Sequence, residues 1–328
     1  MPPKYGQDHT FEAIFVLGLI GGLMVFEGLF EAAHVAAADM SHMPAPLSLG
    51  WFFSLLLSPA PTGFLLEVPV VSSKTPARTL YFVDSATSYD ERLQDLARGT
   101  SRILSACGEE FGILGKGEKD SGHEVRRFGE EMLFQSLKEH NTQAILDSGV
   151  ETIVTADPHA LNALTKDYQG LPRVEHIAEY ILGQVQAGKL TLSPLEDQSA
   201  VYTYHDPCYL GRHNLLYDPP REVLDAIPGL TRVEMERCRD RSFCCGGGGL
   251  MLFYEPLEDQ RMGQVRVKMA EEAGATAIVT GCPFCLVNLE DGVKTSGLEG
   301  KIEVMDLTEL VARQIGGTED RGPRTEDR

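Results

Sequence analysis

Five of the seven cysteines in this 328-residue chain lie in three tight motifs of the C-terminal half. They are Cys208, the adjacent pair Cys244 and Cys245, and Cys282 and Cys285 of a Cys-Pro-Phe-Cys motif, with 35 residues between the first two motifs and 36 between the last two. Thiolates that converge on one point select iron–sulfur clusters or zinc. A tetrahedral zinc site needs only four thiolates and has no use for the adjacent pair. The pattern therefore favours a single iron–sulfur cluster that moves electrons.

The residues around the cysteines suit such a site. The Cys-Pro-Phe-Cys motif follows an expected strand, so its thiolates would face a helix N-terminus, whose dipole stabilises an anionic cluster. Adjacent cysteines cannot point the same way in regular structure, and the run Gly246–Gly249 supplies the irregular turn that they need. A glycine run by itself is weak evidence, since flexible and phosphate-binding loops contain one too. We predict that Gly246, Gly247 and Gly248 bind the cofactor through backbone N–H groups.

A second strand is expected to end at His205-Asp206-Pro207-Cys208, in the same manner as the strand before Cys282. We therefore add His205 to the residues predicted to bind the cofactor. Cys107 and Cys238 lie outside the three motifs, and we interpret them as ordinary thiols.

The composition narrows the class of protein. The formal charge is −19, from 48 acidic and 29 basic residues, which argues against a nucleic-acid surface because phosphate binding needs clustered Lys and Arg. An odd number of cysteines in tight motifs is unlike a secreted disulfide framework. We expect a reducing compartment and hence a cytoplasmic protein, with attachment to the cytoplasmic face of a membrane as an open alternative.

Short β-branched runs alternate with longer helical patterns after Pro61, which predicts an α/β fold with parallel sheets. The expected strands are Thr79–Val83, Thr152–Thr155, Val201–Tyr204, Ala277–Thr280 and Ile302–Met305. The expected helices are Ser88–Ala106, Val125–Ser148, Glu255–Ala273, Leu286–Val293 and Leu307–Gln314.

The two halves of the chain are related to each other. Residues 149–160 align without a gap on 274–285, at an offset of 125. Asp120 and Ser121 precede Cys244 and Cys245 by 124 residues, and Ser85 precedes Cys208 by 123. Such constant offsets indicate a tandem duplication.

The N-terminal region is apolar. Phe11–Phe30 just reaches the length of a membrane-spanning helix, whereas Leu47–Leu57 is too short unless it is interfacial or re-entrant. A membrane helix or hairpin, a helix packed on a partner, and a signal peptide all remain open. We expect four regions: an apolar segment 1–66, a first repeat 67–195, a second repeat 196–317, and a disordered tail 318–328.

The segments HDPCYLGRHN, RSFCCGGGG and GCPFCLVNLEDG resemble the cysteine-rich CCG domain of heterodisulfide reductase. They are most similar to membrane-anchored Fe–S oxidoreductases that pass electrons from electron-transfer flavoprotein to quinone. The resemblance covers about Thr79 to Gly316. It implies two CCG domains in a pseudo-twofold arrangement, with a non-cubane [4Fe–4S] cluster held here by Cys208, Cys244, Cys245, Cys282 and Cys285.

The first repeat departs from this pattern. Ser85, Asp120, Ser121, Asp157 and Ala160 stand where the family would carry cysteines, and hard oxygen ligands do not replace thiolates around a soft cluster. We therefore expect no cluster in this repeat. Asp84, Asp120, His123, Asp157 and His159 would converge on the emptied pocket, which could be a hard-metal or proton-handling site; we favour a solvated remnant.

Three hypotheses about function follow. The first is an electron-transfer subunit whose partners are redox proteins: a flavoprotein or ferredoxin-like donor and a quinone-linked acceptor. The second is an autonomous oxidoreductase that acts on a disulfide or a small metabolite, and the third is a structural subunit with a non-redox cluster. Because the family's haem domain and ferredoxin-like clusters find no room in this sequence, we expect a subunit rather than a complete enzyme. We predict no nucleic-acid partner.

Overall fold

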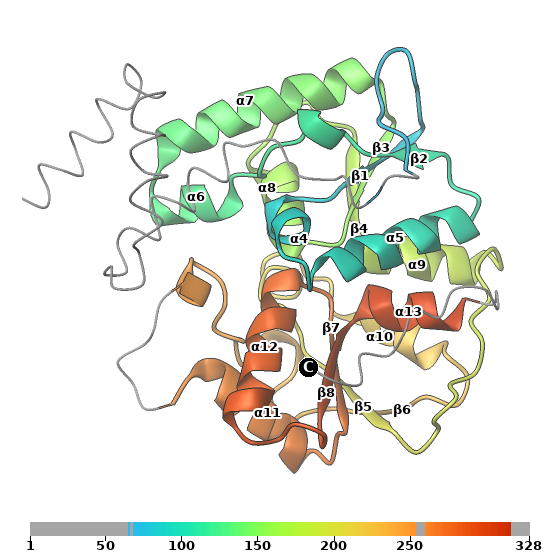
Figure 1. Ribbon diagram of the computed structural model, residues 1–328, viewed down its shortest axis with the longest axis vertical. Helices are drawn as coiled ribbons and strands as arrows, with labels where there is room; N and C mark the ends of the chain where they lie inside the picture. The colour runs from blue at the N-terminus through green and yellow to red at the C-terminus, as the bar shows by residue number, and fades with distance from the viewer. Residues whose placement is uncertain (1–64, 66–67, 254–259, 316–328) are drawn as a thin grey trace, which may run out of the picture. The chain divides into compact units, whose positions relative to one another are not determined.

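Two four-stranded parallel sheets form the framework of the residues that the computed structural model describes, 65, 68–253 and 260–315 (Figure 1). The strand orders are β2-β1-β3-β4 and β6-β5-β7-β8, so the two sheets have the same topology. The strands are β1 (Thr79–Phe82), β2 (Phe111–Gly112), β3 (Thr152–Thr155), β4 (Arg173–His176), β5 (Val201–Tyr204), β6 (Thr231–Val233), β7 (Ala277–Thr280) and β8 (Glu303–Asp306). This confirms the predicted α/β fold with two small parallel sheets.

The helices connect the strands in the same order in each half. In the first half they are α4 (Ser85–Tyr89), α5 (Gln94–Ala106), α6 (His123–Phe128), α7 (Glu131–Ser148), α8 (Pro158–Lys166) and α9 (Ile177–Gln186). In the second half they are α10 (Asp218–Asp225), α11 (Met262–Glu272), α12 (Pro283–Thr295) and α13 (Leu307–Gln314). Short 3-10 helices lie at Gly115–Gly117, Arg239–Arg241 and Met251–Phe253.

Two expected helices are each divided in the structure. The Ser88–Ala106 prediction is wrong between α4 and α5, where the Asp90 side chain accepts hydrogen bonds from the backbone N–H groups of Arg92 and Leu93. Such a side chain offers the backbone a turn in place of a helix. The Val125–Ser148 prediction is wrong at Gly129, which ends α6 in the left-handed conformation at φ 105°, a common glycine helix stop.

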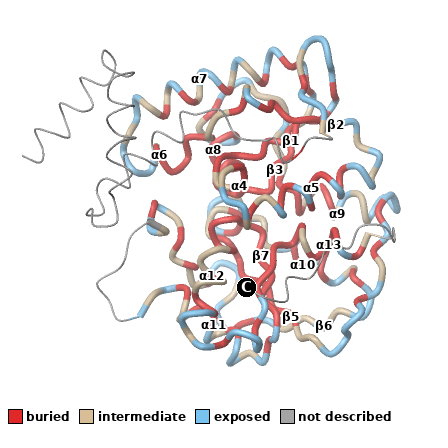
Figure 2. The backbone as a smooth tube through the Cα atoms, viewed as in Figure 1, coloured by how far each residue is buried: buried red, intermediate tan, exposed pale blue. Residues whose placement is uncertain are grey.

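The two halves share an apolar core (Figure 2). It includes inward-facing residues of the central strands of both sheets, such as Tyr81, Val154, Tyr204 and Val279. Helix α5 packs on α13, and α9 packs on α10 (Figure 1). Because α5 and α10 follow the first strand of their sheets and α9 and α13 follow the last, these two contacts are the same contact with the halves exchanged.

The ends of the chain are outside the described residues. These include the apolar runs Phe11–Phe30 and Leu47–Leu57, the tail 318–328, and the start of the expected helix Glu255–Ala273, of which the structure describes α11. Among the helices that the structure does describe, none has the length and apolarity needed to cross a bilayer.

Candidate metal centre

The candidate ligands lie at the carboxyl ends of the two central strands of the second sheet. Cys208 follows β5, and Cys282 directly follows β7 beyond Gly281. Connections leave these neighbouring strands in opposite directions, and such a switch point is where parallel α/β sheets bind ligands. Cys282 is the N-cap residue of α12 and Pro283 occupies its first turn, which also carries Cys285. The predicted strand-to-helix turn is therefore confirmed.

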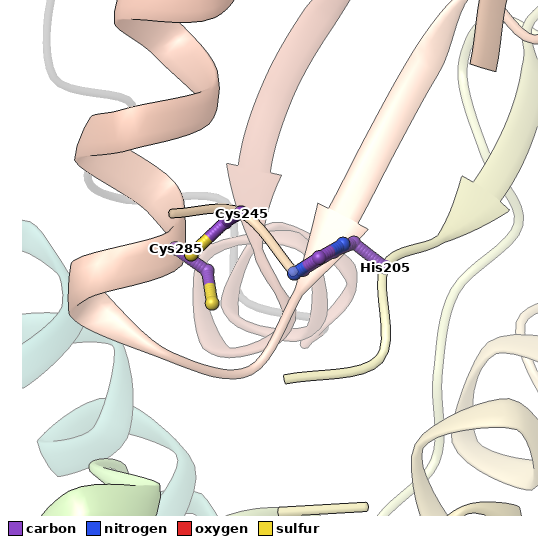
Figure 3. Close-up of side chains that lie close together, drawn as sticks. All are labelled: His205, Cys245 and Cys285. Atoms are coloured by element: carbon purple, nitrogen blue, oxygen red, sulfur yellow. The ribbon is translucent and has the colours of Figure 1, made fainter. Parts of the chain in front are cut away.

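The structure brings all five candidate thiols together. The Cys244 thiol lies within hydrogen-bonding reach of Cys208 and Cys245. Cys245 in turn reaches Cys285, and Cys285 reaches Cys282. Cys245, Cys282 and Cys285 are buried and the other two are half-buried. Figure 3 shows Cys245 and Cys285 from two different segments, side by side and facing His205.

The electrostatics of the thiols favours shared ionisation. Hydrogen bonds from Cys208 and Cys245 lower the pKa of Cys244. Burial opposes ionisation of Cys282, but hydrogen bonds from Cys285 and His159 outweigh it and lower its pKa to about 5. The contact with Cys244 raises the pKa of Cys208 and of Cys245. Because like charges this close cannot all ionise by themselves, a bound cation centre is what would allow five thiolates.

The glycine-rich loop has the irregular geometry predicted for it. Gly246 has φ 91° and Gly249 has φ 66°, conformations that favour glycine. The N–H groups of Gly246 and Gly247 each lie 3.3 Å from a cysteine sulfur, that of Cys244 and that of Cys245 respectively. Two of the three glycines predicted to bind the cofactor thus already direct their N–H groups at candidate ligands.

The space around the other two glycines of this loop differs. At Gly247 a Cβ would lie 3.1 Å from the carbonyl oxygen of Phe284, which is closer than a side chain normally comes. At Gly248 a Cβ would lie 3.5 Å from Cε1 of His159, an ordinary contact. Binding of the cofactor by Gly248 therefore stays a prediction.

His205 is fully buried with one ring nitrogen assigned by its neighbour. The Nε of Arg266 donates to His205 Nδ1 at 3.0 Å, so the ring proton resides on Nε2. That Nε2 has no hydrogen-bond partner among the described residues. One of the ring nitrogens groups with the sulfurs of Cys245 and Cys285 within 4.8 Å. An orphaned buried N–H is costly unless an acceptor is supplied, so the site fits a sulfur-rich cofactor.

Buried arginines hold the segments that carry the thiols. Arg266 also donates to the Arg237 carbonyl at 2.7 Å and to Ser242 Oγ, in the segment before the cysteine pair. Burial lowers its pKa to about 10. Arg221 forms a two-pronged ion pair with Asp206, at 2.6 and 2.9 Å, two residues before Cys208. Bidentate pairs of this kind fix geometry, and thus the position of the Cys208 turn.

The emptied pocket of the first repeat is ordered and largely buried. Asp84, His123, Asp157 and His159 are each less than 5% exposed, while Asp120 is half-buried. Asp84 accepts from the N–H groups of Ser85 and Ser121, and Ser85 donates to Asp120. Our expectation of a solvated remnant is therefore wrong. The hydrogen bonds of backbone and side chains fix these groups, which sequence spacing could not reveal.

Burial keeps the carboxyls of this pocket close to neutral. It is the main cause of the raised pKa values of Asp84, Glu118, Asp120 and Asp157. Glu118 accepts from the N–H groups of Val83 and Asp84, while its other oxygen, like one oxygen of Asp157, is buried without a partner among the described residues. Asp84 adopts φ 64° and ψ 165°, which is a strained conformation for a residue other than glycine.

Glu124 is a residue that the motif comparison missed. Its Oε1 contacts the Nδ1 atoms of both His123, at 3.0 Å, and His159, at 2.5 Å. Its Oε2 accepts from the N–H groups of Gly249 and Leu250 in the second repeat. Hydrogen bonds from the two histidines outweigh burial and lower its pKa. Contacts with Cys282 and Glu124 likewise overcome burial and raise the pKa of His159. The adjacent His-Glu pair was the one sequence signal available.

Positions related by the duplication meet across the two halves. His159 and Phe284, which align at the offset of 125, stack with ring centroids 4.4 Å apart. At the same offset, Asn141 in α7 and Arg266 in α11 are both fully buried. Asn141 binds the backbone of Lys119 and Asp120 as Arg266 binds that of Arg237. The duplication thus preserved the supports of the site while its ligands changed.

The comparisons with known proteins agree with this geometry. Residues 202–290 match the model of the CCG family, the cysteine-rich domain. This chain is therefore a CCG cysteine-rich domain protein.

Curated relatives place it more closely. It is 40% identical over 73% of its length to the probable iron-sulfur-binding oxidoreductase FadF of Bacillus subtilis. It is 35% identical over 71% of its length to EtfAB:quinone oxidoreductase of Syntrophomonas wolfei. Over 76% of its length it is 34% identical to one chain of the dihydromethanophenazine:CoB–CoM heterodisulfide reductase of Methanosarcina barkeri. The chain spans 34% of each of the first two relatives and 61% of the third. It is thus related to iron–sulfur oxidoreductases.

Proposed function

We propose that this chain is an electron-transfer component of a redox complex, with one iron–sulfur cluster held by Cys208, Cys244, Cys245, Cys282 and Cys285. The observation that carries the proposal is the convergence of five thiols from three distant segments on the buried, unpartnered N–H of His205. Such a cluster takes up and releases single electrons. Gly246 and Gly247 donate N–H groups to sulfurs, and Arg266 keeps the ring proton of His205 on the side of the thiols.

The finer assignments are part of the same proposal. Two repeats, 67–195 and 196–317, are related by a pseudo-twofold axis; the exchanged helix contacts α5–α13 and α9–α10 support it. The cofactor is a [4Fe–4S] cluster of the non-cubane type, as the family resemblance implies, with no cluster in the first repeat. The printed names of the relatives suggest the partners, a flavoprotein or ferredoxin-like donor and a quinone-linked acceptor. A cytoplasmic location and a membrane contact through segment 1–66 also remain proposals.

Iron and acid-labile sulfide analysis with EPR, on anaerobically purified full chain, tests the proposal. We expect about four iron atoms per chain and a signal that appears and disappears reversibly with reduction. Zinc in place of iron would overturn the cofactor assignment, and about eight iron atoms would overturn the assignment of the first repeat.

The same material separates the three functions. Reversible reduction together with copurifying redox proteins supports the electron-transfer component. Turnover of a disulfide by the isolated chain would instead favour an autonomous oxidoreductase. A cluster that resists both oxidation and reduction would favour a structural role.

A further inference from the structure

A line of three buried side chains leads from the first repeat to a candidate ligand of the second. His159 Nδ1 lies 2.5 Å from Glu124 Oε1, which leaves Nε2 as the nitrogen available for the hydrogen bond between this imidazole and the Cys282 thiol. Glu124, His159 and Cys282 are 5%, 4% and 0% exposed. The contact is therefore protected from water, where a hydrogen bond to a sulfur has its largest electrostatic effect.

Residues of the second repeat hold this line in place. Gly249 and Leu250 donate their N–H groups to Glu124 Oε2 at 2.6 and 3.1 Å. The ring of His159 stacks on Phe284 at 4.4 Å, and its centroid lies 4.7 Å from that of Tyr209. Both aromatic residues are next to candidate ligands in the sequence. The imidazole is thus fixed by the motifs that carry the thiols, and its orientation does not depend on the first repeat alone.

We propose that His159, oriented by Glu124, is a positioning residue that donates a hydrogen bond to Cys282 and raises the reduction potential of the centre. The inference rests on the proposed function, in which Cys282 is a cluster ligand. A donor to a thiolate stabilises the more negative, reduced state, and hydrogen bonds to sulfur are a known lever on cluster potential. Glu124 acts as the outer carboxylate that fixes a metal-site histidine does elsewhere.

The duplication gives the inference its second support. The position equivalent to His159 in the second repeat is Phe284, which has no donor. The first repeat thus carries a donor at the place where its twin carries only an apolar ring, and that donor faces the thiols. A repeat that has no thiols of its own would in this way still set the properties of the neighbouring centre.

The test is the midpoint potential of the full chain, purified anaerobically and titrated with EPR detection. His159→Phe keeps a ring on Phe284 but removes the donor, so we expect unchanged iron content and a lower midpoint potential. His159→Gln retains an N–H group and should restore most of the shift. The matched control is His213→Phe, because the His213 ring stacks on the outer contact Tyr209 at 4.4 Å; its potential should equal that of the wild type.

Pulsed EPR of protein labelled with ¹⁵N-histidine provides a readout that packing alone would not change. We expect two classes of coupled nitrogen in the wild type, from His159 and His205, and loss of one class in both His159 variants. Equal potentials in wild type and His159→Phe with iron retained would overturn the inference while leaving the proposed function intact. If His159→Phe loses iron, His159→Gln decides: unchanged nitrogen couplings overturn the inference. Absence of iron from the wild type would overturn the proposed function itself.

Discussion

The two halves of this protein have the same strand order but contain opposite chemistry at the same place. Beyond the central strands of the second sheet lie soft, polarisable thiols, with N–H groups directed at them. Beyond those of the first lie oxygen atoms, which accept N–H groups from their own backbone. An identical framework therefore presents either a soft donor set or a closed hydrogen-bond network, depending on a few side chains.

The difference teaches how a ligand set is lost without loss of the fold. Ser85 and Asp120 bond to each other, and Asp157 caps α8 by accepting from the His159 N–H at 2.7 Å. These short polar side chains satisfy backbone groups that would otherwise face the vacated space. The supports Asn141 and Arg266 persist in both halves. Ligation and structural support are thus separable in this fold.

The largest expected effect distinguishes Cys282 from its equivalent Asp157. Cys282→Ser removes a thiolate from the proposed centre, so iron should fall from about four atoms per chain to near zero. Asp157→Asn keeps the helix cap and should leave the iron content unchanged. Anaerobic iron and sulfide analysis measures both, with Cys107→Ser and Cys238→Ser as controls that should behave as the wild type. Full iron in Cys282→Ser would remove that residue from the ligand set.

A second pair of changes compares the buried supports. Arg266→Met leaves His205 Nδ1, the Arg237 carbonyl and Ser242 without their buried donor, and we expect a loss of about 3 kcal/mol of unfolding free energy. Asn141→Leu removes the contacts to Lys119 and Asp120 and should cost about 2 kcal/mol. Urea unfolding gives both values. Only Arg266→Met should also reduce iron retention; equal iron loss in the two variants would mean that the halves are not functionally distinct.

A third comparison uses the helix caps that follow the last strand of each sheet, His176 and Asp306. Burial raises the pKa of Asp306 to about 7 and lowers that of His176 to about 4. Between pH 3.8 and 7 the unfolded aspartate loses a proton that the folded one keeps, so stability falls as pH rises. Between pH 6.5 and 4 the unfolded histidine gains a proton that the folded one refuses, so stability falls as pH drops.

The two slopes should therefore be removed separately. Asp306→Asn should flatten the fall toward neutral pH, by at most about 4 kcal/mol, and His176→Asn the fall toward acid, by at most about 3 kcal/mol. Both replacements retain a side chain that can accept at the helix N-cap. Urea unfolding from about pH 4 to about pH 8 provides the measurement, since this range spans both shifts. A single variant that flattens both limbs would show that the two caps do not titrate independently.

Much of the framework was predictable from the sequence because it depends on local patterns. β3, β7 and α13 have the predicted bounds, since β-branched runs and capping residues act over a few positions. The predicted convergence of Cys208, Cys244, Cys245, Cys282 and Cys285 also follows from strand ends and motif spacing. The breaks at Asp90 and Gly129 were missed, because a single turn residue competes weakly with a long helical pattern until the tertiary structure decides.

The contacts between the halves could not be predicted in this way. Glu124 has no equivalent among the motif positions, and its partners Gly249 and Leu250 lie 125 and 126 residues away. The burial of Asp157 and His159 depends on the second half covering them. Long-range packing determines these features, and a sequence pattern contains no direct signal for it.

The smallest expected effect concerns the polar link between the halves. Arg92 of the first repeat donates to Glu290 and Glu309 of the second, at 2.8 and 2.6 Å, with 35% of its side chain exposed. Arg92→Met should cost about 1 kcal/mol, since partly exposed ion pairs contribute little. Arg78→Met breaks a pair within one half whose side chains are 69% and 70% exposed, and should cost nothing measurable. If both variants unfold at the wild-type urea concentration, the shared apolar core by itself holds the halves together.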